Sequence, residues 1–314
     1  MSARPTVGIQ IPTVDGHGHG YADLRPMVRA AERVGFQSVW FGDHLLSNVP
    51  IVESVVAATT AAAVSEHVHV GFAVMLPALR HPVWLAKQLC SLQVVSGGRL
   101  ELGIGVGGEI RAEWELAGVP IGERGRRTDR FLAALPQMMT GQTAALGEPW
   151  NLTVPPLLPA AGMPPLWIGG RSDAALRRAV RSGAGWMGLW VDKTRLIAAN
   201  ASMTAMAAEL GVAVPAVGAQ VMVHLGVDQE AAEREVALFM EAIYRIPYAK
   251  IRKWVAVGDF ETVVERLVTL VNAGAQTVVL IPAMREFGAH IDELGAIASE
   301  VLRRSTSEFT SINR

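Results

Sequence analysis

Short apolar runs rich in β-branched residues alternate along the chain with longer segments whose apolar positions recur at helical spacing. The first pattern predicts strands and the second predicts amphipathic helices. The expected strands are 7–12, 38–44, 68–76, 99–107, 166–170, 186–190, 219–227 and 277–282. The expected helices include one that begins near Leu24 and those at 53–65, 82–96, 124–140, 261–271 and 291–303.

Strands that alternate with helices in this way predict a parallel α/β fold. A closed (β/α)8 TIM barrel with insertions is favoured, and an open doubly wound sheet is the alternative, because the alternation alone does not establish closure. The glycine run at 103–108 follows a strand, but its spacing differs from the dinucleotide-binding fingerprint of open sheets. We expect one barrel domain over 1–304, followed by a polar, frayed tail at 305–314.

Two segments interrupt the alternation. The connection 141–165 is rich in proline and glycine and is longer than an ordinary barrel loop. The second segment, 243–257, precedes the last strand-helix unit and is expected to cover the mouth of the barrel.

Composition narrows the classes of partner. The chain has 314 residues, a formal net charge of -1 and no polybasic run, so nucleic acid and anionic membrane surfaces are not expected partners. Every apolar run is shorter than the roughly 18 residues of a membrane span. Cys90 is the only cysteine, and the N-terminus has no signal-peptide apolar core, so we expect a cytoplasmic protein.

Polar residues at the ends of predicted strands are the candidates for chemistry, because barrel enzymes carry their active sites there. Asp43 and His44 end the second strand, and a histidine beside a carboxylate can transfer protons near neutral pH. The alternative is that Asp43 caps the following loop.

A glycine run ends the fourth strand. Gly105, Gly107 and Gly108 lack side chains, which would let a flat ring lie against the backbone, although tight turns also require glycine. Glu109 follows and is a candidate general acid or hydrogen-bond acceptor, with a solvated surface glutamate as the alternative.

The fifth strand leads into a candidate phosphate site. Gly169, Gly170, Arg171 and Ser172 open a helix, whose free backbone N–H groups and positive end can hold a phosphate. Ser172 as an ordinary N-cap is the competing interpretation. Asp173 would have to point away from a bound phosphate.

The signal for a metal is weak. His17 and His19 stand in a glycine-rich loop without the ligand spacing of a helical metal motif, so no metal is expected. The chain also lacks a Gly-x-Ser-x-Gly elbow, a Walker loop and a Cys-x-x-Cys pair, which argues against the corresponding hydrolase and zinc-site classes.

Four ordered segments resemble the luciferase-like monooxygenase superfamily, the flavin and deazaflavin barrels related to bacterial luciferase. They are 31–44, which ends in Trp40-Phe41-Gly42-Asp43-His44, 80–88, which begins with Arg80-His81-Pro82, 96–107, which begins with Ser96-Gly97-Gly98-Arg99-Leu100, and Trp167-Ile168-Gly169-Gly170-Arg171-Ser172. The resemblance covers nearly all of 5–300. It implies a cofactor ring across the carboxyl ends of the strands and a homodimer.

The resemblance also implies roles for particular residues. Asp43 and His44 would lie beside the ring, and Val74-Met75 would occupy the place where members often have a non-proline cis peptide behind it. Residues 170–172 would take the cofactor phosphate, and Trp186 and Leu189 would wall the pocket.

The resemblance leaves two cofactors open. The expected one is coenzyme F420, because the Ser-Gly-Gly-Arg-Leu and Gly-Gly-Arg-Ser segments are similar to those of F420-dependent members. FMN is the alternative, although Val106 stands about where some FMN-using members have a phosphate-binding arginine. We expect an oxidoreductase that transfers hydride between the deazaflavin and a small organic substrate, with His44 or Glu109 handling a proton. The alternatives are a reduced-FMN monooxygenase that uses O2 and a barrel that binds cofactor without catalysis.

Overall fold

Eight parallel strands form a closed barrel in the computed structural model, which describes residues 4–15, 23–285 and 287–312. They are β1 (Thr6–Gln10), β2 (Ser38–Phe41), β3 (His69–Met75), β4 (Leu100–Ile104), β7 (Leu166–Gly169), β8 (Gly185–Leu189), β9 (Val217–Leu225) and β11 (Thr277–Pro282). Neighbours pair in the order β11, β1, β2, β3, β4, β7, β8, and β9 pairs with both β8 and β11, which closes the ring. The closed barrel expected from the sequence is confirmed.

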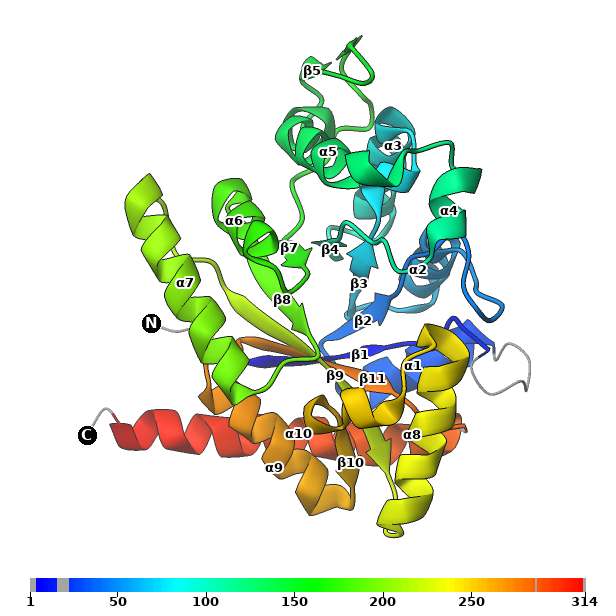
Figure 1. Ribbon diagram of the computed structural model, residues 1–314, viewed down its shortest axis with the longest axis vertical. Coiled ribbons are helices and arrows are strands. Elements are labelled where there is room, and N and C mark those ends of the chain that lie inside the picture. The colour runs from blue at the N-terminus through cyan, green and yellow to red at the C-terminus, as the bar shows by residue number, and fades with distance from the viewer. Residues whose placement is uncertain (1–3, 16–22, 286, 313–314) are drawn as a thin grey trace.

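Helices surround the strands (Figure 1). They are α1 (Leu24–Arg33), α2 (Ser54–Val64), α3 (Pro82–Val95), α4 (Arg111–Leu116), α5 (Arg124–Met139), α6 (Asp173–Ser182), α7 (Lys193–Leu210), α8 (Gln229–Tyr244), α9 (Phe260–Asn272) and α10 (Phe287–Ile312). Asp192, Asp228 and Asp259 accept backbone N–H bonds as N-caps of α7, α8 and α9. No helix in the described ranges is long and apolar enough to cross a bilayer.

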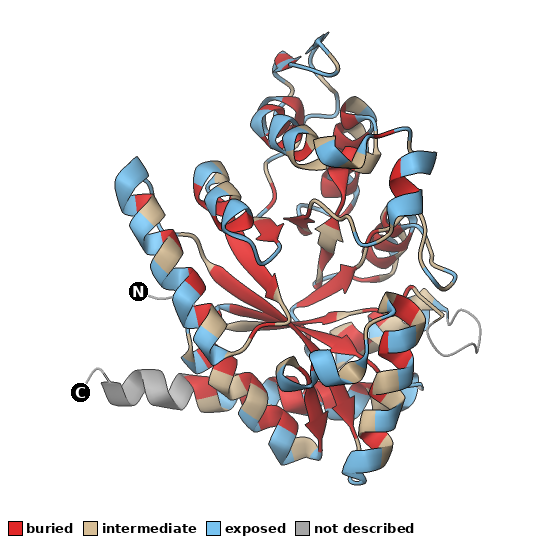
Figure 2. Cartoon of the chain, viewed as in Figure 1, coloured by how far each residue is buried: buried red, intermediate tan, exposed pale blue. Residues whose placement is uncertain are grey.

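The core has an inner and an outer layer. Side chains that point outward from the strands pack under the helices, so the strands are buried while the outer helix faces are exposed (Figure 2). Inside the barrel, Trp40 packs with Trp167, Met187 and Val279. Gly71 leaves room for Trp40, since a Cβ there would lie 2.4 Å from Cε3 of its ring.

The two interrupting segments fold differently from each other. Within 141–165, β5 (Ala144–Leu146) and β6 (Leu152–Val154) form a small antiparallel sheet at the top of Figure 1. Within 243–257, the 3-10 turns η3 (Tyr248–Lys250) and η4 (Arg252–Trp254) lead into β10 (Ala256–Gly258), which extends the sheet beside β9. Ile251 and Val255 pack with Met222 and Ile281 from β9 and β11, so this segment covers one side of the barrel mouth, as expected.

Several predicted boundaries are wrong, including those at the end of the fourth strand and at the end of the last helix. The strand predicted at 99–107 ends at Ile104, because the following glycines take up a turn with Gly107 at φ 56° and Gly108 at φ 121°. The last helix continues to Ile312 instead of ending at Arg303, because no glycine or proline interrupts it. Ser305, which the sequence assigned to the frayed tail, is buried, and its hydroxyl donates to the Val301 carbonyl at 2.7 Å.

Candidate active site

His44 lies just beyond β2, where its ring is anchored by a glutamate that the sequence did not single out. Glu113 on α4 is fully buried, and its carboxylate lies 3.2 Å and 3.3 Å from His44 Nδ1. The Leu45 backbone N–H donates to the same carboxylate at 3.2 Å. With Nδ1 engaged, Nε2 is the ring nitrogen left for a ligand.

The surroundings of His44 favour its charged form. Burial works against the imidazolium, but the hydrogen bond to Glu113 and the negative charges of Glu113, Glu109 and Asp43 outweigh it and raise the pKa of His44 above its ordinary value. A quarter of the side chain remains exposed. The imidazole can therefore carry a proton near neutral pH and present it to the barrel mouth.

Asp43 has a different environment from the one expected. Its buried carboxylate accepts from Ser54 Oγ and the Leu76 backbone N–H at 2.7 Å and 2.8 Å, and it forms a two-pronged ion pair with Arg80, both nitrogens at 2.7 Å. These four bonds engage both oxygens of the carboxylate. Asp43 thus ties the end of β2 to the end of β3, which agrees with the capping alternative.

The carboxyl end of β3 is irregular. Its register with β4 shifts between Phe72 and Met75, and the peptide bond between Ala73 and Val74 is cis, one residue before the Val74-Met75 bond that the resemblance indicated. Ala73 and Val74 are partly exposed, although Phe72 and Met75 on either side are fully buried. Val74 is therefore partly exposed at the carboxyl end of β3, whereas Met75 packs into the outer core.

The glycine run after β4 makes room for protein side chains. A Cβ on Gly105 would lie 2.3 Å from Val74 Cγ2, and one on Gly169 would lie 2.8 Å from Val74 Cγ1. Val74 thus fills the space between the ends of β4 and β7. At Gly107 the corresponding neighbours are Leu76 and Trp114. The Val74 methyl groups therefore form part of the surface beside these glycines, and the expectation that a flat ring lies against this surface stays a prediction.

Glu109 is exposed beside the same opening. Its charge contributes to the raised pKa of His44 and also acts on Tyr244, at the end of α8. Burial, helped by that charge, raises the pKa of Tyr244 to about 12, so the phenol stays protonated and can donate a hydrogen bond. The charge of Glu109 therefore acts on both His44 and Tyr244, although the three residues come from distant segments.

The start of α6 has the features expected of a phosphate site. Gly170 adopts φ 113°, and Ser172 caps the helix by accepting from the Ala175 N–H at 3.3 Å. The Ser172 hydroxyl can still donate its own hydrogen, so the capping and phosphate interpretations are compatible. Asp173 is exposed in the first turn.

Trp186 and Leu189 lie on opposite sides of β8. Trp186 is fully buried in the outer core, and its Nε1 donates to the Gly170 carbonyl at 2.7 Å. The expectation that Trp186 walls the pocket is therefore corrected: it supports the loop before α6 from behind. Leu189 is partly exposed and packs with the cluster from 243–257, so it does border the mouth.

Arg171 is exposed, and it lies against two tryptophans that the sequence did not connect with it. Its guanidinium carbon lies 5.5 Å from the ring centroids of both Trp190 and Trp254. Trp190 follows β8 with φ 53°, a left-handed conformation that non-glycine residues rarely adopt. Tyr244 packs edge-on against Trp190 with centroids 5.7 Å apart. No local pattern indicated this cluster, because its members come from three separate segments.

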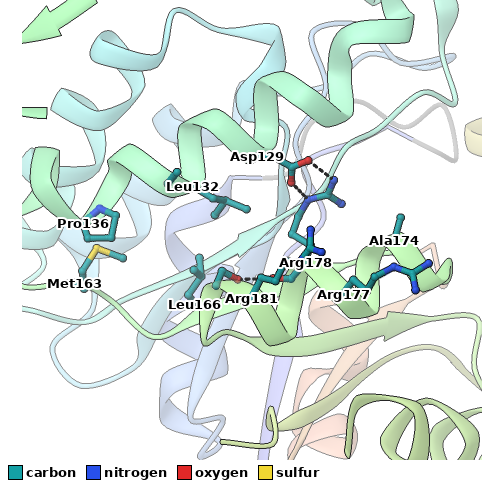
Figure 3. A pocket seen from close by; sticks show the side chains of 11 residues that line it. Asp129, Leu132, Pro136, Met163, Leu166, Ala174, Arg177, Arg178 and Arg181 are labelled. Atoms are coloured by element: carbon teal, nitrogen blue, oxygen red, sulfur yellow. Dashed lines mark hydrogen bonds and ion pairs between the residues drawn. The ribbon is translucent and has the colours of Figure 1, made fainter. Parts of the chain in front are cut away.

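A cavity of about 570 Å³ lies elsewhere, between α5 and α6 on the outside of the barrel (Figure 3). Arg178 in its wall pairs with Asp129, while Arg177 and Arg181 line the α6 side. None of the expected site residues lines this cavity. We therefore place the candidate active site at the mouth.

No group of three or more metal-ligating side chains occurs within the part of the chain that the structure describes. His17 and His19 lie outside the described residues, so the sequence-based expectation of no metal stays a prediction.

The residues at the mouth fit a flavin-type cofactor. The Val74 methyl groups and the adjacent glycines offer an apolar surface for a ring, and the start of α6 offers donors for a phosphate. His44 lies nearby with one nitrogen free. The fit is therefore consistent with a ring and a phosphate bound by the same face of the barrel.

Comparisons with known proteins agree with this geometry. The sequence matches the model of the luciferase-like monooxygenase family over residues 6–277. An uncharacterized protein of Mycobacterium tuberculosis is 30% identical over 184 residues, which make up 52% of this chain and 63% of that relative. The match thus spans less than two thirds of the relative's length.

Solved structures share the fold at low sequence identity. An F420-dependent secondary alcohol dehydrogenase has a TM-score of 0.81 at 15% identity, covering 95% of this chain and 99% of that one. The oxygenating constituent of 3,6-diketocamphane monooxygenase from Pseudomonas putida, in complex with FMN, has a TM-score of 0.76 at 18% identity, covering 96% and 98%. Because the family model matches most of the sequence, this chain belongs to the luciferase-like monooxygenase family and is an enzyme.

Proposed function

We propose that the enzyme is an F420-dependent oxidoreductase that transfers hydride between the deazaflavin and a small organic substrate at the barrel mouth. The observation that carries the proposal is His44, held through Nδ1 by the buried Glu113, with no hydrogen bond from Nε2 to any described residue. Reduced deazaflavin, when bound, supplies a hydride. Each hydride added to an organic acceptor must be matched by a proton, and His44 has the position and charge preference to hold one.

The remaining residues of the site have binding roles in this proposal. Val74, Gly105 and Gly169 provide the surface behind the ring, while Gly170 and Ser172 donate to the phosphate. Met75, Asp43 and Trp186 act indirectly, by holding the bulge and the loop before α6 in place. Glu109 is the second candidate for proton transfer. Gly107 has a packing role, because the Leu76 side chain occupies the space that a side chain at position 107 would need.

The second candidate is a reduced-FMN monooxygenase. The family is named for this activity, and the similar barrel from P. putida binds FMN. Reduced FMN supplies two electrons to O2, and that chemistry benefits from exclusion of water. The cover formed by Trp254 and Tyr248 would serve this purpose.

Binding measurements decide between the two. We expect coenzyme F420 to quench the tryptophan fluorescence of the purified protein and FMN to bind more weakly in both redox states. Selective binding of FMN would replace the F420 proposal with the monooxygenase. Tight F420 binding without turnover across a broad panel of acceptors would favour a carrier without catalysis.

The role of His44 requires a separate test. In anaerobic single-turnover reactions, His44→Gln should slow hydride transfer by about 100-fold or more, the usual contribution of a positioned acid or base. His67→Gln is the matched control, because that histidine is exposed. Unchanged rates in both His44→Gln and Glu109→Gln would refute the proton-transfer assignments.

A homodimer is also proposed, through the outer face of α2 and α3. Val56, Trp84 and Val95 expose 59%, 70% and 63% of their surfaces, and such apolar exposure on adjacent helices favours burial against a partner. Sedimentation should give a dimer for the unaltered protein and a monomer for Trp84→Glu.

We further propose a cytoplasmic location, which suits the buried free thiol of Cys90.

A further inference from the structure

The cavity of about 570 Å³ between α5 and α6, on the outside of the barrel, takes no part in the site at the mouth (Figure 3). We call it the α5–α6 cavity. Its volume falls within the range of roughly 300–1,000 Å³ that is typical of small-molecule sites. The size of the cavity therefore suits a ligand of its own.

One part of the lining of the α5–α6 cavity is apolar. Leu132 and Pro136 line it from α5, where their spacing of four residues places them on one face of the helix. Met163 and Leu166 line it from the segment that enters β7, and both side chains are only partly buried against the core. These groups offer apolar surface to the hydrocarbon part of a ligand.

The α6 side of the cavity carries cations. Arg181 follows Arg177 by four residues and Arg178 by three, so the three side chains share one face of α6, and all three line the cavity. Figure 3 shows Met163 toward one end of the cavity and Arg177 toward the other. A ligand with one apolar part and one anionic part would match this arrangement.

Two of these arginines have no acidic partner. The Arg178 guanidinium donates to both carboxylate oxygens of Asp129, at 2.5 Å and 3.2 Å, which neutralises that cation. Arg177 and Arg181 form no ion pair with any residue in the described part of the chain. The net charge of the whole chain is -1, so this excess of positive charge is local to the cavity.

We infer that the α5–α6 cavity is a binding site for a small organic anion, a carboxylate attached to an aromatic or aliphatic body. Arg177 and Arg181 bind the carboxylate, because a guanidinium donates well-matched, charge-assisted hydrogen bonds to that group. Met163 and Leu166 contact the body of the ligand. A concave, partly apolar site favours a small molecule over an extended protein surface.

The α5–α6 cavity is separate from the proposed cofactor site. Leu166, which lines the cavity, is the first residue of β7, whereas Gly169 at the mouth is the last. The lining also includes Ser182, the last residue of α6, which lies at the opposite end of that helix from Ser172. The inference therefore holds whichever cofactor the enzyme uses.

Calorimetric titrations with 4-phenylbutyrate and with its neutral amide test the inference. The carboxylate should bind the unaltered protein about tenfold or more tightly than the amide, because only the carboxylate pairs with the two arginines. Its affinity should also fall as the salt concentration rises. Failure of 4-phenylbutyrate to bind, or equal affinity for the two compounds, would refute the site.

Methyl NMR of the protein labelled at its methionines locates the bound ligand. The Met163 signal, assigned with Met163→Leu, should shift when 4-phenylbutyrate is added, because Met163 lines the cavity. The signal of Met222, which packs with the cover segment at the mouth, should not shift. A shift of Met222 without one of Met163 would place the ligand at the mouth and overturn the inference.

Two variants separate the charge of the cavity from its volume. The double variant Arg177→Gln/Arg181→Gln should weaken 4-phenylbutyrate by about tenfold or more and leave the amide unchanged. Ala133→Trp should abolish binding of both compounds, because Ala133 is an exposed lining residue of α5 and the indole would fill the space. Undiminished binding of 4-phenylbutyrate by Ala133→Trp would contradict the assignment.

Arg130→Gln is the matched control, since Arg130 is an exposed arginine of α5 that does not line the cavity. It should leave both affinities unchanged. Thermal unfolding of each variant shows whether a loss of binding comes from misfolding. Binding of hexaglutamate, but not of 4-phenylbutyrate, would assign the arginines to an acidic protein segment and overturn the inference.

Discussion

The pairing of His44 with Glu113 brings a carboxylate into a fully buried position at the edge of the site. Such a charge is tolerated only with partners, and here they are an imidazole and the Leu45 backbone N–H. The pair also fixes which ring nitrogen faces the ligand. Glu113 is therefore a positioning residue that acts through His44.

Replacement of Glu113 tests that coupling. In Glu113→Gln the negative charge is lost while the burial of His44 remains, so the pKa of His44 should fall from above 6.5 in the unaltered protein to a lower value. Histidine NMR titration measures the shift directly. Glu115→Gln, an exposed change on the same helix, should leave it unchanged.

The same shift has a consequence for stability. Because the folded pKa of His44 exceeds the unfolded one, the pair contributes fully below about pH 6.5, and the contribution disappears as pH rises through the folded pKa. Glu113→Gln should reduce this pH dependence of the unfolding free energy. An identical dependence in both proteins would contradict the assignment.

Steric contact between Val74 and Gly105 is a second residue-scale feature. In Gly105→Ala the new Cβ would lie 2.3 Å from Val74 Cγ2, so we expect a loss of about 1–3 kcal/mol in unfolding free energy. Urea denaturation measures it. Gly122→Ala is the control, because nothing lies within 4 Å of that Cβ position.

A double variant tests whether the steric clash with Val74 causes the loss of stability in Gly105→Ala. Val74→Ala removes the methyl group that clashes, so adding Gly105→Ala to it should cost much less than in the unaltered protein. Additive losses would show that the two residues are not in steric conflict.

Among the elements, β2, β3 and α2 are joined at their ends by one polar network. Asp43 accepts from Ser54 at the start of α2 and from Leu76 after β3, and Arg80 bridges Asp43 to Glu53, the N-cap of α2. The network fixes the strand ends that carry His44 and Val74. The network therefore acts on the site by holding His44 and Val74 in position.

Asp43→Asn should destabilise the fold by about 3 kcal/mol, because it leaves Arg80 without its buried partner. Asp129→Asn breaks a more exposed ion pair with Arg178 and should cost less than about 1 kcal/mol. Chemical denaturation of both variants provides the comparison. A loss no greater than in Asp129→Asn would contradict the role of the Asp43 network.

At the scale of the whole molecule, the barrel closes where the last barrel strand, β11, pairs with the first, β1, and α10 follows β11 in the chain. Arg304 near its end forms ion pairs with Glu261 of α9 and with Glu300, and Ser305 is buried. Ser305, which the sequence assigned to the tail, is thus buried, and the domain boundary at 304 stays a prediction that truncation can test.

Deletion of 306–314 should change the unfolding free energy by less than about 0.5 kcal/mol, because this mostly polar terminus lies beyond the buried residue Ser305. Deletion of 304–314 removes the Arg304 ion pairs and Ser305, and should destabilise the protein further. Thermal unfolding distinguishes the two truncations. Equal losses would show that Arg304 and Ser305 add no stability to the domain.

Sequence patterns predicted the larger elements well. Strands such as 277–282 and helices such as 124–140 have clear periodicity and capping signals, and both are local properties. The six-residue helix α4 and the three-residue strand β10 were missed, because elements of that length contain too few residues to establish a period.

By itself, the sequence determined the succession of strands and helices, the barrel fold through its pattern and resemblance, and the placement of polar residues and glycines at strand ends. Tertiary structure alone decided that His44 meets Glu113, 69 residues away, and that the Asp43 carboxylate is occupied by Arg80. It also decided that Val74 fills the space beside Gly105. Periodicity and capping act between near neighbours in the chain, whereas these contacts exist only because barrel closure gathers the carboxyl ends of all the strands on one face.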